Sequence, residues 1–332
     1  MRKYVVKIGL LSIILCAAAC NSTQNTSAEN TTANTPELGV ADLEVSVNNL
    51  KDNLEYLASD ELKGRNTGSP GIEKAADFIE NKLREYNVEP FFKTYRDTFS
   101  TSGRTAYNIV GVIPGKDLEL KQQYILIGAH YDHIGIQKPV DNDSIANGAD
   151  DNAAGTVSVL ELSRKFSQIN QNKRSIIFAL FSGEELGLKG SAHLAEKLKS
   201  QGIDLYAMVN LEMVGVPMKD KDYLAYLTGF NLSNMAEVFN KYADKKVLGF
   251  LPQAAQYNLF RRSDNYSFYE QFHVPAQTLS SFDFTNYEYY HKVQDEAAKM
   301  DFEFMASLVK QLIPGLYKMA NSPQKEIKLT EG

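Results

Sequence analysis

Cysteine is scarce in this sequence of 332 residues. The two cysteines, Cys16 and Cys20, both lie close to the N-terminus. The rest of the chain therefore has no thiol that could form a disulfide and no thiolate that could bind a metal. Any metal bound by this larger part must be held by histidine and carboxylate side chains.

The N-terminal apolar run is too short to cross a bilayer. It covers residues 8–19, whereas a membrane-spanning helix needs roughly 20 apolar residues. Three basic residues precede it, as in a secretory signal peptide: Arg2, Lys3 and Lys7. It ends in Ala-Ala-Ala-Cys, which resembles a bacterial lipobox, and ordinary signal-peptide cleavage nearby is the alternative. We predict residues 1–20 as a lipoprotein-type signal peptide, with a lipid anchor on Cys20.

An excess of positive charge is also absent. Thirty-five basic residues less the three in the signal leave 32 against 41 acidic ones, a net charge of −9. A surface of this sign does not favour nucleic acid or anionic lipid. We therefore expect no nucleic-acid partner, and membrane contact only through the lipid anchor. The protein should be exported, as a periplasmic or outer-membrane-associated lipoprotein or as a secreted protein.

The remaining sequence indicates one domain behind a tether. Residues 21–36 are mainly Ser, Thr and Asn, which predicts a flexible segment. Residues 37–332 show no repeat and no interdomain linker. Buried strands alternate there with amphipathic helices, for example over residues 42–58, 72–86 and 302–312. This alternation predicts a three-layer α/β/α sandwich around a central, mostly parallel mixed sheet. The turn-rich segment 64–71 and the Gly- and Asp-rich segment that ends in residues 148–155 are predicted to be loops.

Three predicted strands end in side chains that can bind a metal. The strands are apolar enough to be buried on both faces and cover residues 124–129, 175–181 and 207–211. The residues that follow them are one histidine and three carboxylates: His130, Glu184, Glu185 and Glu212. Ligands of open α/β sheets bind beyond the carboxyl ends of the strands. Carboxylates are costly there unless they hold a cation or a proton, although acids also favour the first turn of a solvated helix.

Two more potential ligands complete this set. Asp151 lies at a predicted helix start and His291 in a late loop. Imidazoles and carboxylates without sulfur suit a catalytic zinc with an open position, or two zincs that share a carboxylate. Asp132 is placed to orient His130 from a second shell. Glu184 would remain free to take a proton from water.

Five motifs carry a resemblance to a known family. They are HYDH, GADDNAAG, FSGEELGLKGS, NLEMVG and YYH, in this order along the chain. They resemble the secreted bacterial aminopeptidases that have a co-catalytic pair of zincs, a peptidase family that also contains the glutaminyl cyclases. The segment LEYLASDELKGRNTGSPGIEKAADFI is similar to the N-terminal region of that family, so the resemblance covers about residues 50–312. It implies a zinc-exopeptidase type of α/β/α fold over the catalytic domain, residues 37–332.

The resemblance also implies a role for each matching residue. One zinc would be held by His130 and Glu212, and the other by Glu185 and His291, with Asp151 bridging both. Glu184 would be the general base that deprotonates the attacking water and later protonates the leaving amine. Tyr290 matches a tyrosine that in some members stabilises the oxyanion.

The sequence departs from the family at one ligand. Where the family usually has NLDMVG, this chain has Glu212, whose carboxylate is one methylene farther from the backbone. Metal-site geometry is exacting, so the zinc beside His130 is expected to be weaker, shifted or absent. A single zinc on Asp151, Glu185 and His291 is the arrangement of the family's glutaminyl cyclases.

The leading hypothesis is a zinc metallo-aminopeptidase, a hydrolase that removes N-terminal residues from peptide substrates with metal-activated water. Two zincs are expected, and one is the alternative. The second hypothesis is a glutaminyl cyclase with a single zinc. A binding ectodomain without chemistry would have lost its ligands or base, which this chain retains. The aromatic residues around positions 282–290 are interpreted as a pocket wall, His133 as second-shell or structural, and His193 and His273 as inert.

Overall fold

The computed structural model describes residues 38–39 and 44–330. The predicted signal peptide and tether, residues 1–36, lie outside the described residues. All described residues belong to one compact unit. None of the helices that they form is long and apolar enough to span a bilayer.

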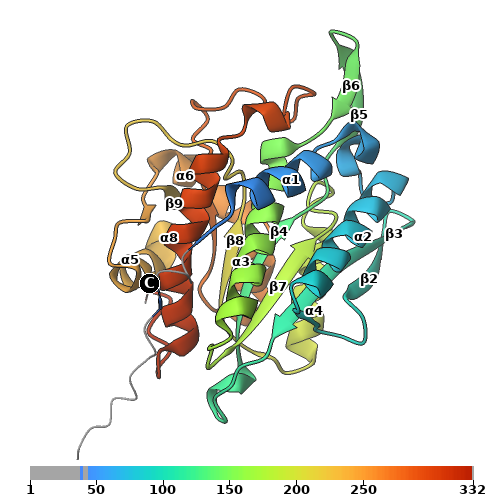
Figure 1. The fold of residues 1–332 in the computed structure, drawn as a ribbon. Coiled ribbons are helices and arrows are strands. Elements are labelled where there is room, and N and C mark those ends of the chain that lie inside the picture. The colour runs from blue at the N-terminus through green and yellow to red at the C-terminus, as the bar shows by residue number, and fades with distance from the viewer. Residues whose placement is uncertain (1–37, 40–43, 331–332) are drawn as a thin grey trace, which may run out of the picture. The chain divides into compact units, whose positions relative to one another are not determined.

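Nine strands of the described chain form one mixed sheet, in the order β1-β3-β7-β4-β8-β11-β9-β10, with β2 paired to β3 (Figure 1). Their bounds are β1 Glu89–Pro90, β2 Arg96–Thr101, β3 Arg104–Ile113, β4 Gln123–His130, β7 Ser175–Phe181, β8 Asp204–Leu211, β9 Ala225–Leu227, β10 Leu248–Gly249 and β11 Ala276–Ser280. Two further strands, β5 Gly135–Val140 and β6 Asp143–Ala146, form a separate hairpin.

The middle of the sheet is parallel. β4 pairs parallel with β7 on one side and with β8 on the other, and β8 pairs parallel with β11. β3 and β9 flank this block in antiparallel orientation. The three strands that the sequence predicts to end in metal ligands are therefore adjacent, and their carboxyl ends meet at one edge of the sheet.

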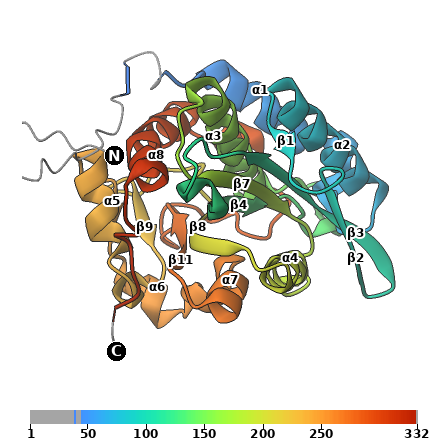
Figure 2. The same ribbon diagram turned by 90° about the horizontal axis from the view of Figure 1, so that it is seen from below.

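Helices cover both faces of the sheet (Figure 2). Their bounds are α1 Val47–Leu57, α2 Pro70–Glu85, α3 Gly155–Ile169, α4 Lys189–Ser200, α5 Met235–Ala243, α6 Pro252–Gln256, α7 Asn265–Phe272 and α8 Phe302–Asn321. α1, α2, α3 and α8 pack on one face in a single hydrophobic cluster, and α4 and α7 pack on the other face in a second cluster. The predicted three-layer α/β/α fold is confirmed.

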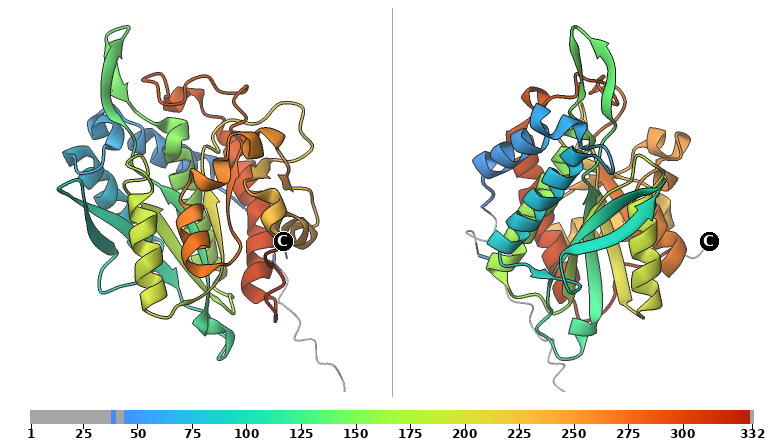
Figure 3. Two further views of the ribbon diagram at one scale, coloured as in Figure 1. Left: turned by 180° about the vertical axis from the view of Figure 1, so that it is seen from behind. Right: turned by 90° about the vertical axis from the view of Figure 1, so that its right-hand side faces the viewer.

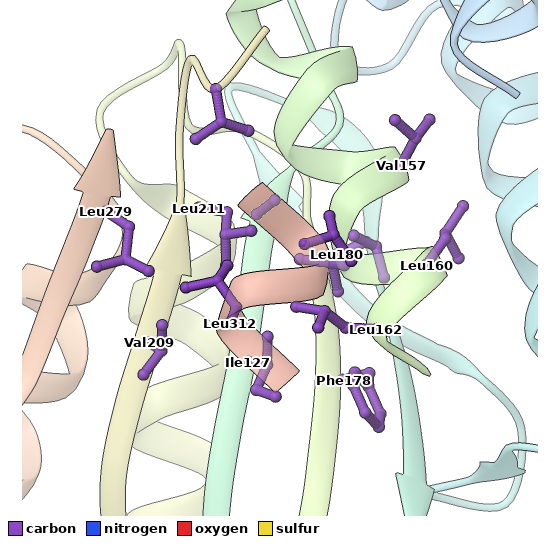
Figure 4. Packing of buried hydrophobic residues seen from close by; sticks show 14 of the residues in the cluster. Ile127, Val157, Leu160, Leu162, Phe178, Leu180, Val209, Leu211, Leu279 and Leu312 are labelled. Carbon is purple, nitrogen blue, oxygen red and sulfur yellow. The ribbon is translucent and has the colours of Figure 1, made fainter. Parts of the chain in front are cut away.

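The larger core lies between α3, α8 and the parallel strands (Figure 4). Leu160 of α3, Leu180 of β7 and Leu312 of α8 are all fully buried in it. Both faces of β7 are buried along its whole length, which explains why its sequence, SIIFALF, is a continuous apolar run rather than an alternating one.

The helices start where the sequence supplies caps. The Ser69 side chain accepts a hydrogen bond from the Ile72 amide, and Pro70 occupies the first position of α2. The Asp301 carboxylate accepts one from the Phe304 amide at the start of α8. Such side chains satisfy amides that have no partner within the helix.

Three segments differ from the sequence-based expectation. The Gly- and Asp-rich segment after β4, expected to be a loop, contains the β5–β6 hairpin, which projects from the rest of the ribbon (Figure 3). Residues 265–272, for which no helix was predicted, form α7 because Phe268 packs into the second cluster. α8, expected over 302–312, continues through Pro314 to Asn321, since its second half is buried against the core.

Truncation of a core side chain should destabilise the protein by leaving a cavity. Leu180→Ala should lower the free energy of unfolding by about 2–5 kcal/mol, because the site is close-packed on all sides. Leu118→Ala is the matched control: Leu118 is 83% exposed and its change should stay within about 0.5 kcal/mol. Urea unfolding of both variants measures the difference. Equal losses would contradict the assignment of Leu180 to the core.

Candidate metal centre

The predicted ligands come from five separate segments. His130 ends β4. Glu185 lies in the turn after β7, and Glu212 follows β8 directly. Asp151 belongs to a helical turn, η4 (Ala149–Ala154), that leads into α3, and His291 belongs to the loop between β11 and α8. The parallel order β7-β4-β8 brings the first three to the same edge of the sheet.

Asp151 lies at the centre of this group. Its Oδ1 atom is 3.3 Å from His130 Nε2, and its Oδ2 atom is 3.1 Å from His291 Nε2. The two carboxylate oxygens therefore face different imidazoles. This is the orientation expected of a carboxylate that bridges two metal positions.

Glu185 faces two imidazoles in a similar way. Its Oε2 atom is 3.2 Å from His291 Nε2, and its Oε1 atom is 3.0 Å from His133 Nδ1. His133 Nδ1 also lies 3.6 Å from Asp151 Oδ2. Donor atoms of His133, Asp151 and Glu185 thus lie within 4.8 Å of one another, as in a metal site.

His133 belongs to the donor cluster, although it was not among the metal ligands predicted from the sequence. We expected a second-shell or structural role, and the structure brings its fully buried imidazole into the donor cluster. Its position, three residues after His130 and beyond the end of the same strand, is the signal that pointed to this edge of the sheet. Gly148, at a φ of +63°, makes room for it, since a Cβ there would lie 2.5 Å from the His133 ring.

Glu212 has a different partner. Its half-buried carboxylate accepts a hydrogen bond from the Ser263 hydroxyl. Among the described residues, no ion pair within 4.0 Å joins Glu212 to a histidine. Burial raises the pKa of Glu212 to about 7, against the opposing effects of His130 and Ser263. The other four predicted ligands lie together, and Glu212 stands beside them.

The two predicted catalytic residues line one pocket with the cluster. Glu184 donates its backbone amide to Asp132 Oδ1 at 3.2 Å. Burial raises the pKa of its carboxyl group well above the ordinary value; His130 opposes this, and Glu212 and Asp264 add to it. Tyr290 stacks on the His291 ring with the centroids 4.0 Å apart. Burial, together with the nearby carboxylates, raises its pKa well above 10, so the hydroxyl keeps its proton.

Hydrogen bonds hold the ligand segments in place. Asp132 lies next to His130 as predicted: its carbonyl oxygen is 3.2 Å from His130 Nδ1, and its Oδ1 atom is 3.7 Å away. Asp295 Oδ2 accepts from the Asp151 amide at 3.1 Å, and Asp295 Oδ1 accepts from the Tyr287 hydroxyl at 2.6 Å. The Asp151–Asn152 peptide bond is cis.

Arg65 joins two of these segments from beneath. Its fully buried guanidinium donates to the carbonyls of Tyr131, Asn147 and Gly148 at 2.6–2.8 Å. One carbonyl follows His130, and the other two precede the turn that carries Asp151. Burial lowers the Arg65 pKa to about 10, which the surrounding carboxylates oppose. The sequence placed Arg65 in a turn-rich loop and gave no sign of this role.

The donor set fits a divalent cation. His130 Nε2 and Asp151 Oδ2 are buried, and although their ionisable neighbours lie 3.3 and 3.1 Å away, neither atom makes a hydrogen bond of acceptable geometry among the described residues. Burial lowers the pKa of His291, but Asp151 and Glu185 outweigh it and raise the pKa to about 10. The carboxylates thus favour a proton on the neighbouring imidazole, and a bound cation would replace that proton. Imidazole and carboxylate donors without sulfur suit zinc.

A pocket of about 590 Å³, partly open to solvent, adjoins the cluster. Its lining combines carboxylates with apolar, hydroxyl and basic side chains: Asp151, Glu184, Glu212, Met213, Tyr226, Thr228, Leu259, Arg262, Ser263, Thr278, Ser280, Phe282, Phe284, Tyr290 and His291. Three of the five aromatic residues expected in a pocket wall are present. Tyr287 and Tyr289 are not among the lining residues; Tyr287 instead supports Asp295.

The remaining histidines lie outside the cluster. His193 of α4 lies 3.2 Å from Asp97 and stacks on Phe99. His273 caps the C-terminus of α7 in a left-handed conformation. Neither contacts a predicted ligand in the ion pairs of the described residues.

Comparison with known proteins gives the family. The model of peptidase family M28 matches residues 108–313, more than half of the chain. A probable leucine aminopeptidase of Trichophyton verrucosum is 26% identical over 290 residues, which are 84% of this chain and 73% of that protein. A probable zinc metalloprotease of Pyrenophora tritici-repentis is 41% identical over 107 residues. These are 32% of this chain, and the chain spans only 24% of that relative's length.

The fold is shared with a solved structure. The LapA aminopeptidase of Legionella pneumophila superposes with a TM-score of 0.66 at 22% identity, over 86% of this chain and 75% of that one. The comparisons confirm the fold class and the peptidase family that the sequence predicted, and the donor set fits the zinc that the family resemblance implies. The resemblance of the five motifs is confirmed as well. The chain belongs to peptidase family M28.

Proposed function

We propose that the protein is a zinc aminopeptidase that hydrolyses the first peptide bond of peptide substrates. The observation that carries this proposal is the position of Glu184. Its carboxylate lines a pocket that the metal cluster and an apolar wall share. A base, a metal and a side-chain pocket that meet in one cavity are the parts that exopeptidase chemistry requires.

Five residues would hold zinc: His130, Asp151, Glu185, Glu212 and His291. Zinc, when bound, would act as a Lewis acid that polarises the scissile carbonyl and makes water more acidic. Asp132 fixes the orientation of the His130 ring from its Nδ1 side. Asp295 fixes the backbone of Asp151, so both ligands are oriented before a metal arrives.

Glu184 is the proton carrier in this proposal. Its carboxylate would take a proton from the attacking water and later deliver it to the leaving amine. Its buried surroundings raise its pKa well above the ordinary carboxyl value. A raised pKa makes this carboxylate a stronger base toward the attacking water.

Tyr290 and the pocket would orient the substrate. The Tyr290 hydroxyl stays protonated and faces the same cavity, where it could donate to the oxyanion of the tetrahedral intermediate. The side chain of the substrate's first residue would lie against Phe282, Phe284 and Met213, which favours apolar residues. The free α-amine would be held near Glu184 and Glu212.

Glutaminyl cyclase activity is a second candidate because of Glu212. Its hydrogen bond to Ser263 draws this carboxylate toward a polar side chain rather than toward His130. A cyclase needs one zinc and a proton-carrying glutamate, which would again be Glu184. In this reaction the substrate's own amine attacks its Gln side-chain amide and releases ammonia.

We further propose export with a lipid anchor at Cys20. The proposal follows from the basic start, the short apolar run and the Ala-Ala-Ala-Cys sequence. A Thr-, Ser- and Asn-rich tether would then hold the catalytic domain away from the membrane. Metabolic labelling with a tagged fatty acid, lost in Cys20→Ala, tests the anchor.

Mass spectrometry of a mixed peptide set tests the activity. The zinc-loaded protein is incubated with peptides that begin with apolar, acidic, basic or Gln residues. The aminopeptidase proposal expects loss of whole N-terminal residues, fastest for apolar ones. Loss of ammonia from the Gln peptides alone would replace it with the cyclase, and an unchanged peptide set would contradict both.

Glu184→Gln tests the general base. The substitution keeps the size of the side chain but removes its basic oxygen, so kcat should fall by about 10²- to 10⁴-fold. Zinc content and substrate affinity should stay within about twofold, because the ligands are unchanged. The matched control is Glu196→Gln, at an exposed position of α4, which should keep full activity. Full turnover by zinc-loaded Glu184→Gln would refute the proposed role.

Asp264 gives the site a measurable pH dependence. It is fully buried, and burial raises its pKa to about 6 against the opposing effects of His130 and Ser191. Because the folded-state pKa is raised, the folded protein favours the protonated form. Its contribution to stability is complete below the ordinary carboxyl pKa and is lost as the pH rises through about 6.

The stability of Asp264→Asn relative to the original protein should therefore increase as the pH rises. The difference in unfolding free energy between the metal-free variant and the metal-free original protein should shift in the variant's favour by an amount on the order of 1 kcal/mol from about pH 5 to about pH 8. Urea unfolding at the two pH values measures this shift. A difference that is constant with pH would show that Asp264 does not titrate in this window.

A further inference from the structure

The cluster offers two metal positions that share Asp151. The first, which we call the His133 side, is bounded by Asp151 Oδ2, Glu185, His291 and His133. The second, the His130 side, is bounded by Asp151 Oδ1 and His130. Glu212, its predicted third donor, lines the same pocket as Asp151. The two positions differ in how many donors converge on them.

On the His133 side, imidazole nitrogens and carboxylate oxygens from four residues lie close together. The distances between its imidazole nitrogens and carboxylate oxygens are 3.0, 3.1, 3.2 and 3.6 Å. Donors about 2.0–2.2 Å from a tetrahedral zinc are roughly 3.3–3.6 Å apart. Asp151, His133 and Glu185 are buried or nearly so. Three of the four distances are 0.1–0.3 Å below this range, so the donors need to separate only slightly to accept an ion. His133 adds an imidazole to the three donors that the family motifs predict.

The His130 side lacks its third donor in the present arrangement. Glu212 is fixed at its backbone, where its amide donates to the Leu279 carbonyl at 3.0 Å. At its tip, the carboxylate accepts from Ser263. The Ser263 oxygen in turn accepts from Asn210 Nδ2 at 2.8 Å, which leaves the hydroxyl hydrogen for Glu212. A cation beside His130 must compete with this hydrogen bond for the Glu212 carboxylate.

We propose that the two positions bind zinc with unequal affinity and that Ser263 sets the difference. The His133 side binds first and retains its ion. The His130 side fills only when Glu212 leaves Ser263. Ser263 is thus a positioning residue that controls the second binding event. This inference rests on the zinc dependence in the proposed function, but not on which peptide reaction the protein catalyses.

Calorimetric titration of the metal-free protein with zinc tests the proposal, and native mass spectrometry counts the bound ions. The original protein should show two binding events, separated by at least about tenfold in Kd. Ser263→Ala removes the competing hydrogen bond, and Glu212→Asp shortens the side chain to the family's usual length. Both should tighten the second event by about tenfold or more and leave the first unchanged.

His133→Gln should act on the other event. It should weaken the first event by about 10- to 100-fold, the usual effect of removing a group at a metal site. His193→Gln, which changes a histidine that pairs with Asp97 instead, is the control and should alter neither event. Circular dichroism of each metal-free variant confirms that it is folded before titration.

Three results would overturn the proposal. Two events of equal affinity in the original protein would remove the asymmetry. A weaker second event in Ser263→Ala would show that the hydroxyl supports Glu212 as a ligand instead of competing for it. An unchanged first event in His133→Gln would remove His133 from the site. If zinc binds in two unequal steps but no peptide is altered, the proposed function fails while this inference stands.

Discussion

The crowding of carboxylates at one edge of the sheet is the constraint on which the rest of the structure depends. Asp151, Glu184, Glu185 and Glu212 gather at a partly or fully buried site. Like charges removed from water repel strongly, and the protein interior screens them weakly. Burial is the main cause of the raised pKa values of Glu184 and Glu212, and repulsion between the carboxylates adds to it; the same carboxylates raise the pKa values of His130 and His291.

The fold holds these carboxylates together at the edge of the sheet where a metal could bind. Because β7, β4 and β8 are parallel neighbours, the three acid or imidazole side chains that follow them lie at the same edge of the sheet. Arg65 and Asp295 then fix the backbone of the two loops that carry the remaining groups. A dication at the centre would offset the repulsion, so the binding of metal and the stability of this edge are coupled.

The sequence was sufficient for the fold and for the location of the site. Continuous apolar runs identified β4, β7 and β8, and the residues after each run identified the edge where the ligands meet. The order of five motifs identified the family. These features are local in the sequence, and a buried parallel strand leaves a clear local pattern.

The features that escaped prediction depend on contacts between distant segments. α7 is weakly amphipathic, and it forms because Phe268 packs beneath the sheet. Arg65 binds carbonyls that are 66 and 82 or more positions away along the chain. The partner of Glu212 is Ser263, 51 residues later, and His133 meets Glu185, 52 residues later. No periodicity or spacing within one segment reports such pairings.

A zinc-edge anomalous difference map from crystals of the zinc-loaded protein tests the central claim most directly. The account predicts the strongest peak among Asp151, Glu185 and His291, with His133 facing it, and a weaker peak beside His130. Both peaks should disappear after treatment with a chelator. A strongest peak anywhere else in the molecule, or a map without any peak at this edge of the sheet, would contradict the account.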